Sequence, residues 1–216
     1  MLNLKCQTED TFDQLFETKE KLGEGAQSIV KRVIDRNTGS EYAAKIMRNQ
    51  DAETILKIKQ QFKLQKTLDL PTLVRAHWLF ISERESTCRL ILDFCQWRDL
   101  RTQLNEFGRF KEDFAAEVLK ALLETCDYLH GKGVCHRDIK PENILYSLND
   151  SPCLRLVDFG ISTYKNKHRQ EMWTTTGTLF YKAPEMFLGS YTSKVDVWAI
   201  GIVGYELLHG RTPFVR

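Results

Sequence analysis

The hydrophobic pattern of the chain changes its period near residue 94, and this change limits the possible folds more than any other feature. Before it, short apolar segments are bounded by turn residues, which is typical of strands. These segments cover residues 16–22, 29–34, 42–47, 79–81 and 89–94. After Trp97, apolar side chains recur at helical spacing from Phe110 to Leu129, which predicts a long amphipathic helix that ends by Gly131.

Two further segments complete the pattern. Residues 51–68 contain neither Gly nor Pro and carry a loose helical stripe that ends before Pro71. Residues 196–208 are apolar on nearly every side, so a helix there must be buried on most sides. We therefore predict an α+β protein with a β-rich N-terminal lobe and a helical C-terminal lobe. The predicted boundaries are an extension at 1–15, the first lobe at 16–94 and the second at 95–216.

Composition excludes several classes of protein. The 216 residues are 42% hydrophobic and 28% charged with a net charge of +2, which argues against a disordered chain, a nucleic-acid-binding protein and a membrane-bound protein. No apolar stretch is long enough to span a membrane, and we recognise no signal peptide in residues 1–10. None of the 6 cysteines is spaced as a zinc ligand or a CxxC pair, so we expect reduced thiols and a cytoplasmic protein.

Several residues suit the binding of a nucleoside triphosphate. Asp138, Asn143 and Asp158 lie in polar turns beside short apolar runs, and their oxygen ligands suit Mg²⁺. The Gly-Glu-Gly turn at residues 23–25 would let the backbone approach a bulky anion. Lys45 stands in an apolar strand, where it needs an anionic partner. Each feature also has an ordinary structural explanation as a hairpin turn, a lysine extended to solvent or an Asx-turn, so their order along the chain must decide.

That order resembles the signature motifs of the protein kinases. His-Arg-Asp-Ile-Lys-Pro-Glu-Asn covers residues 136–143, Asp-Phe-Gly covers 158–160 and Ala-Pro-Glu covers 183–185. Upstream, the segment at 23–30 and Lys45 stand where the family has its glycine-rich loop and its strand lysine. The resemblance covers the chain beyond the predicted extension, and it implies a two-lobed protein-kinase fold.

The resemblance also implies an ATP- and Mg²⁺-dependent enzyme with a role for each of these residues. Asp138 would orient the attacking hydroxyl or accept its proton, and Lys140 would reach the γ-phosphate. Lys45 would hold the α- and β-phosphates, while Asn143 and Asp158 would hold the metal. Catalysis in this family is mainly positioning and stabilisation of charge.

Two patterns resemble serine/threonine kinases rather than tyrosine kinases. They are Asp-x-Lys at 138–140 and the Gly-Thr pair at 177–178. The implied partner is therefore a protein substrate with a Ser or Thr acceptor. The segments at 181–185 and 210–214 further resemble the calcium/calmodulin-dependent group of kinases.

The same resemblance places the nucleotide. Leu92 would stand beside the adenine as the gatekeeper, and Asp93 and Cys95 would offer it backbone hydrogen bonds. Ordinary packing at a strand end is the alternative for these last two residues. The full set of implied nucleotide contacts comprises Leu22, Gly23, Gly25, Val30, Ala43, Lys45, Asp93, Cys95, Asp99 and Leu145, with Asp99 at the ribose.

Arg137, next to Asp138, suggests regulation by phosphorylation, because an Arg there can pair with a phosphate and order the activation segment. Thr174, Thr175 and Thr176 are the candidate acceptors, and an activating kinase would then be a partner. The alternative is a solvated run of hydroxyl residues.

The predicted helix at 51–68 departs from the family pattern. The family has a Glu there that pairs with the strand lysine, and the matching position, 10 residues before Pro71, is Gln61, with Gln60 beside it. An amide can still hydrogen-bond Lys45, but it binds a cation less strongly than a carboxylate does. We expect a weak Lys45 clamp, or a carboxylate supplied from elsewhere.

The C-terminal region departs as well. The family continues with further helices, one of which carries an Arg that pairs with the residue matching Glu185. The resemblance therefore predicts a C-terminally truncated kinase domain with exposed apolar surface. Two alternatives stay open: a weakened kinase that acts as a nucleotide-binding pseudokinase or scaffold, and an incomplete gene model of an ordinary kinase.

Overall fold

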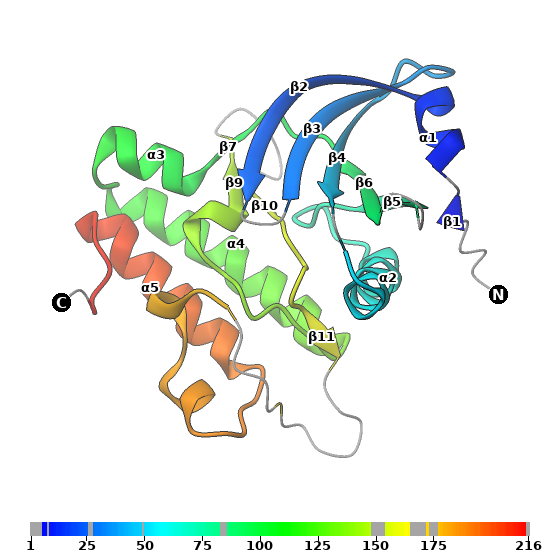
Figure 1. Ribbon diagram of the computed structural model, residues 1–216. Coiled ribbons are helices and arrows are strands. Elements are labelled where there is room, and N and C mark those ends of the chain that lie inside the picture. Colours follow the sequence, from blue (N-terminus) through cyan, green and yellow to red (C-terminus); the bar gives the residue numbers. More distant parts are fainter. Residues whose placement is uncertain are drawn as a thin grey trace. The chain divides into compact units, whose positions relative to one another are not determined.

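The structure is a computed structural model that describes residues 6–7, 9–25, 28–48, 50–82, 86–147, 154–164, 172 and 177–214. These residues form two compact units (Figure 1). One unit comprises the described residues of Met1–Asp69 and Val74–Gln96, and the other those of Leu70–Leu73 and Trp97–Arg216. The first is rich in strands and the second in helices, so the predicted α+β class is confirmed.

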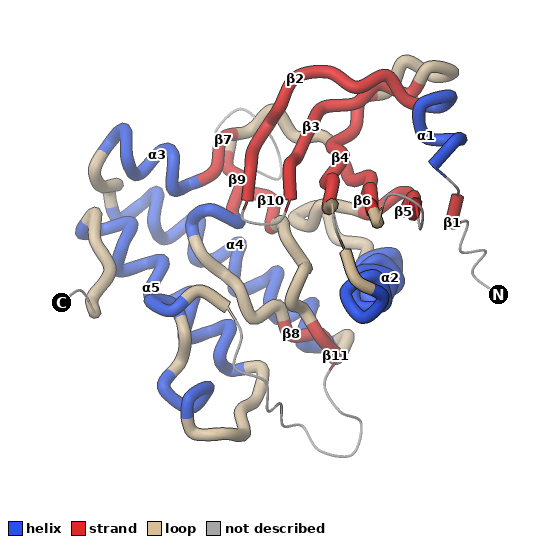
Figure 2. The backbone as a smooth tube through the Cα atoms, viewed as in Figure 1, coloured by secondary structure: helices blue, strands red, loops and turns tan. Residues whose placement is uncertain are grey.

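The first unit is built on one six-stranded sheet (Figure 2), in the order β1-β5-β6-β4-β3-β2. Its strands are β1 (Cys6–Gln7), β2 (Phe16–Gly25), β3 (Ser28–Asp35), β4 (Glu41–Met47), β5 (Ala76–Ser82) and β6 (Thr87–Asp93). All neighbours pair antiparallel except β1 and β5. The five predicted strands are therefore confirmed. Strand β1 was not predicted, because 2 residues are too few to show the alternation of apolar and polar side chains that marks a strand.

The turn between β3 and β4 forms where the sequence predicts it. Asp35 Oδ1 accepts the backbone N–H groups of Asn37 and Thr38 at 2.8 and 3.2 Å. Gly39 closes the turn at φ 71°, in the left-handed region that glycine enters without a steric penalty. This short loop fixes the pairing of β3 with β4, and with it the row of residues that includes Lys45.

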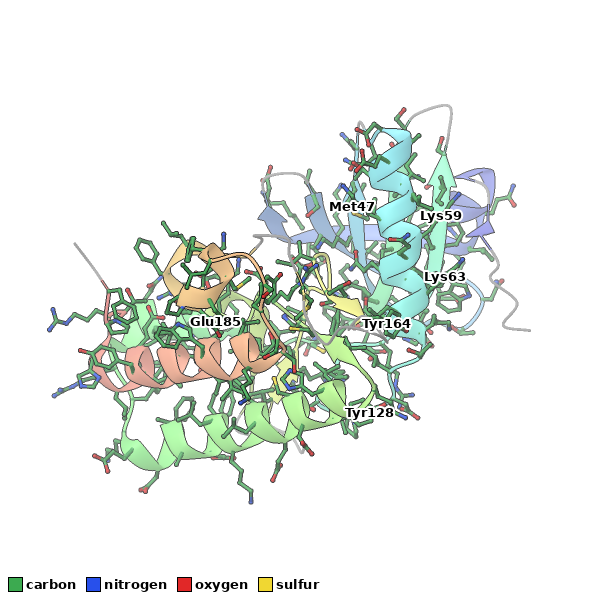
Figure 3. The ribbon with its side chains drawn as sticks, turned by 90° about the horizontal axis from the view of Figure 1, so that it is seen from below. Met47, Lys59, Lys63, Tyr128, Tyr164 and Glu185 are labelled. Carbon is green, nitrogen blue, oxygen red and sulfur yellow. The ribbon has the colours of Figure 1, made fainter. Side chains whose placement is uncertain are left out.

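Alternation along β4 sends its side chains to two opposite faces of the sheet. Ala44 and Ile46 join a buried cluster with Phe12 of α1 (Glu9–Leu15). Met47 joins a second cluster with Ile58 and Phe62 of α2 (Ala52–Lys66). Odd-numbered residues of β4 therefore face the side that α2 covers, and Figure 3 shows α2 with Lys59 and Lys63 beside this sheet.

The second unit contains three helices and two small sheets. The helices are α3 (Leu100–Phe107), α4 (Glu112–Gly131) and α5 (Lys194–His209). One sheet has the order β10-β9-β7, from β7 (Arg98–Asp99), β9 (Ile144–Tyr146) and β10 (Leu154–Leu156), and the other pairs β8 (Val134–Cys135) with β11 (Thr163–Tyr164). Three short 3-10 helices complete the unit: η1 (Pro141–Asn143), η2 (Leu179–Tyr181) and η3 (Pro184–Phe187).

The predicted amphipathic helix α4 packs against the apolar helix α5, and the two run side by side in Figure 1. Gly204 allows the close approach, because a Cβ there would stand 2.9 Å from Leu119 Cδ1. Most of α5 is buried, as its apolar sequence predicts, although Val197 remains 46% exposed. None of the described helices is long and apolar enough to cross a membrane.

Candidate active site

Asp138 lies in the loop between β8 and η1, and both of its carboxylate oxygens are bound. Oδ1 accepts the backbone N–H of Thr178 at 3.0 Å and its hydroxyl at 2.9 Å. Oδ2 accepts Asn143 Nδ2 at 3.0 Å and lies 3.0 Å from Lys140 Nζ. The carboxylate is therefore fixed in orientation, and the structure brings together Asp138, Lys140 and Asn143 as predicted from their shared motif.

Thr178 also belongs to this cluster, a contact that its place in the Gly-Thr pair at 177–178 did not predict. Its hydroxyl donates to Asp138 and accepts a hydrogen bond of 2.7 Å from Lys140 Nζ. The hydroxyl thus bridges the two charged side chains. Thr178 lies 40 residues beyond Asp138, so no local period or spacing connects them.

Gly177 makes this contact sterically possible. Its φ is 94°, and a Cβ at this position would stand 2.4 Å from the carbonyl oxygen of Arg137. Any other residue would combine an unfavourable backbone conformation with a collision against the loop that carries Asp138. Glycine therefore lets the segment before η2 lie directly on the loop that carries Asp138.

His136 supports the loop from inside as a neutral imidazole. It is fully buried, and its Nδ1 accepts the backbone N–H of Asp138 at 3.3 Å while Nε2 lies 3.2 Å from the carbonyl oxygen of Val157. Burial lowers the pKa of His136 below its ordinary value, because desolvation disfavours the charged ring. Nε2 therefore carries the ring proton and donates a hydrogen bond to the carbonyl oxygen of Val157.

Asp196, at the start of α5, fixes the backbone of the same loop. Its Oδ1 accepts the N–H of Arg137 at 2.8 Å, and its Oδ2 accepts the N–H of His136 at 2.9 Å and His130 Nε2 at 2.8 Å. Burial acts to raise the pKa of Asp196, but the contacts from His130, His136 and Arg137 hold it below its ordinary value. The ionised carboxylate thus binds two consecutive amides, with Arg137 at φ 70°.

Asn143 and Asp158, the predicted metal ligands, flank one short ladder. Ile144 pairs with Leu156 in the antiparallel β9–β10 ladder, and Val157 donates its N–H to the carbonyl oxygen of Asn143 at 2.9 Å. Asn143 and Asp158 therefore lie at the same end of the ladder. Because the Asn143 amide nitrogen points to Asp138, its oxygen is the atom left for a ligand, and with the Asp158 carboxylate it provides the hard oxygen donors that fit Mg²⁺.

The remaining predicted phosphate contacts lie in the first unit. Gly23, Val30, Lys45 and Leu90 stand in one row across β2, β3, β4 and β6. Directly opposed residues of antiparallel strands share a face, so this row lies on the α2 side of the sheet. Ala43 and Leu92 form the next pair on the same face. Leu22 and Gly25 are exposed residues of β2.

The helix glutamine is where the sequence places it, in α2. Gln61 is 8% exposed and therefore buried. Glu53, an acid earlier in the helix, pairs instead with Lys57 at 2.7 Å on the exposed surface. The expected weakness of the Lys45 clamp stays a prediction.

Two predicted nucleotide contacts of the second unit, Asp99 and Leu145, stand directly opposite each other in the β7–β9 pair. Asp99 also caps α3, since its Oδ1 accepts the N–H of Thr102 at 2.8 Å and its Oδ2 the hydroxyl of Thr102 at 2.7 Å. The Asp-x-x-Thr spacing is a sequence signal for such a cap. A ribose hydroxyl at Asp99 would share oxygens that already hold the helix end.

The end of β6 carries Asp93 and, beyond it, Cys95. The backbone N–H of Asp93 donates to the carbonyl oxygen of Arg75 at 3.0 Å. Its carboxylate accepts the N–H of Arg75 at 3.0 Å and lies 2.6 Å from His77 Nε2. The backbone N–H of Asp93 is therefore already used within the chain, and Cys95 is half-buried.

The side chain of Arg137 reaches the segment after Asp158. Its Nε donates to the carbonyl oxygen of Ile161 at 2.7 Å, and its Nη1 donates to the Tyr191 hydroxyl at 3.3 Å. The candidate acceptors Thr174–Thr176 lie outside the described residues. Glu185 of η3, labelled in Figure 3, has no ion-pair partner among the residues that the structure describes.

Comparison with known proteins agrees with this geometry. A profile of the protein kinase domain matches residues 16–216. The chain belongs to the protein kinase family.

Its relatives in this family include kinases that depend on calcium. The chain is 33% identical over 198 residues to calcium-dependent protein kinase 3 of Plasmodium yoelii yoelii, covering 91% of this chain and 36% of that protein. It is 36% identical over 208 residues to human calcium/calmodulin-dependent protein kinase type IV, covering 95% of this chain and 43% of that protein. The chain thus spans less than half the length of these relatives, and the pseudokinase alternative finds no support among them.

Proposed function

We propose that this kinase domain transfers the γ-phosphate of ATP to Ser or Thr hydroxyls of protein substrates. The observation that carries the proposal is the doubly bound carboxylate of Asp138. A general base must stand at hydrogen-bond distance from the hydroxyl it activates and must hold its orientation. Thr178, Asn143 and Lys140 supply that orientation.

The roles of the other residues follow from their chemistry. Lys140 would reach the γ-phosphate with its ammonium group, where charge changes during transfer. Asn143 and Asp158 would hold Mg²⁺, which, when bound, neutralises phosphate charge. Lys45 would hold the α- and β-phosphates. Ala43, Val30 and Leu145 would stack on the adenine, and the carbonyl oxygen of Asp93 would accept from its edge.

We also propose that Arg137 binds the phosphate that an activating kinase adds at Thr174–Thr176, because its planar guanidinium suits a phosphate.

We further propose a reducing, cytoplasmic location. Its support is that four cysteines among the described residues are free: Cys88, Cys95, Cys126 and Cys135.

The first test replaces the base. Asp138→Asn keeps the shape of the side chain but removes its charge and basicity, so we expect the rate of phosphate transfer to a Ser/Thr peptide to fall at least about 100-fold. Transfer is measured with ATP and Mg²⁺, and thermal shift with ATP measures nucleotide binding separately.

The matched control is Asp127→Asn, the same chemical change on the exposed surface of α4. This variant should transfer phosphate at the rate of the unmodified chain. An Asp138→Asn chain that keeps its rate would contradict the proposed role of Asp138. An unmodified chain that binds ATP without any transfer would favour the scaffold alternative.

A further inference from the structure

Four side chains that can bind a metal ion converge where α4, α5 and β8 meet. Cys126 and His130 are separated by one turn of α4, so they share one face of that helix. One donor atom each from Cys126, His130 and Asp196 of α5 lies within 4.8 Å of the other two. Cys135 of β8 adds a second sulfur, 3.3 Å from Asp196 Oδ2. All four residues belong to the second unit, and Figure 3 marks this end of α4 with Tyr128.

The types of donor atom select the metal. Thiolate sulfur, imidazole nitrogen and carboxylate oxygen together suit Zn²⁺, whereas Mg²⁺ prefers oxygen ligands alone. Ligands one helical turn apart are also the arrangement by which paired histidines of a helix bind zinc. The spacing of the cysteines along the sequence does not predict such a site, because its ligands come from three elements that only the fold brings together.

The distances are close to those of a tetrahedral zinc site. Zinc bonds of about 2.0–2.3 Å place neighbouring ligand atoms about 3.3–3.6 Å apart. His130 Nε2 lies 2.8 Å and Cys135 Sγ lies 3.3 Å from Asp196 Oδ2. Each of these contacts therefore needs to open by only about 0.3–0.6 Å. Cys126 and Asp196 are buried, and the side chain of His130 is 17% exposed, which gives an ion access from solvent.

We propose that Cys126, His130 and Asp196 form a binding site for Zn²⁺, in which Cys135 is placed to supply the fourth ligand. The metal replaces the hydrogen that His130 Nε2 donates to Asp196 Oδ2, and the ring keeps a proton on Nδ1. Each ligating thiol gives its proton to solvent. One thiolate and the carboxylate together neutralise the divalent cation, which favours its burial.

Zinc at this site acts on the loop that carries Asp138. Asp196 accepts the backbone N–H groups of His136 and Arg137 at 2.9 and 2.8 Å. When the contact between His130 and Asp196 opens around a metal, the carboxylate shifts relative to these amides. Small misplacements of a positioned group lower catalysis strongly. Bound zinc therefore inhibits phosphate transfer, and this consequence, unlike the binding site itself, rests on the proposed kinase function.

Cobalt spectroscopy tests the site without any enzyme assay. Co²⁺ takes the ligands of a zinc site and reports them through visible bands of tetrahedral geometry and a thiolate charge-transfer band. Titration of the reduced chain with Co²⁺ should saturate at a single equivalent, and Zn²⁺ should remove the bands by displacing the cobalt. Cys126→Ala should bind the metal at least about tenfold more weakly, since loss even of a group behind a ligand costs that much.

Cys88→Ala is the matched control, because Cys88 is also a fully buried cysteine but lies in β6 of the first unit. This variant should keep the cobalt spectrum of the unmodified chain. If Cys126→Ala does not fold, Cys126→Ser replaces it, since the hydroxyl keeps the size of the side chain and removes the thiolate. An unmodified chain without a tetrahedral spectrum, or an unchanged spectrum in the folded Cys126 variant, would overturn the proposal.

Phosphate transfer gives the second readout. Micromolar Zn²⁺ in excess Mg²⁺ and ATP should lower the rate of the unmodified chain at least about tenfold, and a zinc-selective chelator should restore it. Cys126→Ala should keep its rate at the same zinc concentration. Equal inhibition of both chains would contradict the inhibitory role of this site. A cobalt spectrum that depends on Cys126, in a chain that transfers no phosphate, would support the metal site and contradict the proposed function.

Discussion

Gly177 holds two chain segments at a distance that no larger residue permits. A Cβ at this position would lie 2.4 Å from the carbonyl oxygen of Arg137, and φ is 94°. Thr178, the next residue, binds Asp138 through both its amide and its hydroxyl. A shift of a few tenths of an ångström at Gly177 therefore reaches the carboxylate directly.

We expect Gly177→Ala to lower the free energy of unfolding by about 1–3 kcal/mol, the cost of a strained backbone residue. The rate of phosphate transfer should fall by at least about tenfold, because misplacement of a positioned group costs catalysis strongly. Gly39→Ala is the control: its φ is 71° but nothing lies within 4 Å of the added Cβ. Urea denaturation and a peptide assay compare the two variants. Equal transfer rates would show that the close contact at Gly177 is not needed.

Sequence reasoning found those site residues that stand close together along the chain. Asp138, Lys140 and Asn143 share one motif, and the structure joins them around one carboxylate. Thr178 and Asp196 lie 40 or more residues away from the loop they support. Their contacts depend on tertiary packing, which neither periodicity nor spacing encodes.

At the level of elements, long periodic segments were predictable and short ones were not. The helix expected near 110–131 is α4 (Glu112–Gly131), and that expected at 196–208 is α5 (Lys194–His209). Helix α3 has 8 residues with only Leu100 and Leu104 buried, so its apolar stripe is too short to read. Strands of 2 residues such as β8 and β11 exist only because each pairs with the other.

The end of α5 shows how one residue type can have opposite effects within a short distance. Gly210 ends the helix at φ 71°, and a Cβ there would lie 2.4 Å from the carbonyl oxygen of Gly108. Gly201 lies in the exposed interior of the same helix, and nothing lies within 4 Å of its added Cβ. Glycine is therefore required at the first position and unfavourable at the second.

We expect Gly210→Ala to lower the free energy of unfolding by at least about 1 kcal/mol, from the left-handed conformation plus the collision. Gly201→Ala should raise it by about 0.5–1 kcal/mol, because alanine orders the helix more easily than glycine. Each variant serves as the control for the other, since both add one methyl group to or beside α5. Urea denaturation measures both, and changes of the same sign would contradict this account of the helix end.

Across the whole chain, stability should depend on pH through two buried groups: His136, in the loop that carries Asp138, and Asp196, which binds the backbone of that loop from α5. His136 is fully buried with a lowered pKa, so it must gain a proton on unfolding once the pH falls below its ordinary value of about 6.5. Asp196 is fully buried with a lowered pKa, so unfolding takes up a second proton below about pH 4. Each group contributes fully to the free energy of unfolding at pH values above its ordinary pKa. That contribution is lost as the pH falls toward the lower pKa that the group has in the folded state.

The free energy of unfolding should therefore decline in two steps between pH 7 and pH 3, each with a slope of at most about 1.4 kcal/mol per pH unit. Asp196→Asn should lower it at pH 7 by about 3–5 kcal/mol, as expected when one partner of a buried charged network is lost. The variant should also lose the step below pH 4, because no carboxylate remains to bind the amides of His136 and Arg137. Asp127→Asn, an exposed control on α4, should keep both steps. Urea denaturation at a series of pH values measures the free energy of unfolding of all three proteins. If Asp196→Asn still shows the decline below about pH 4, another group must hold the loop.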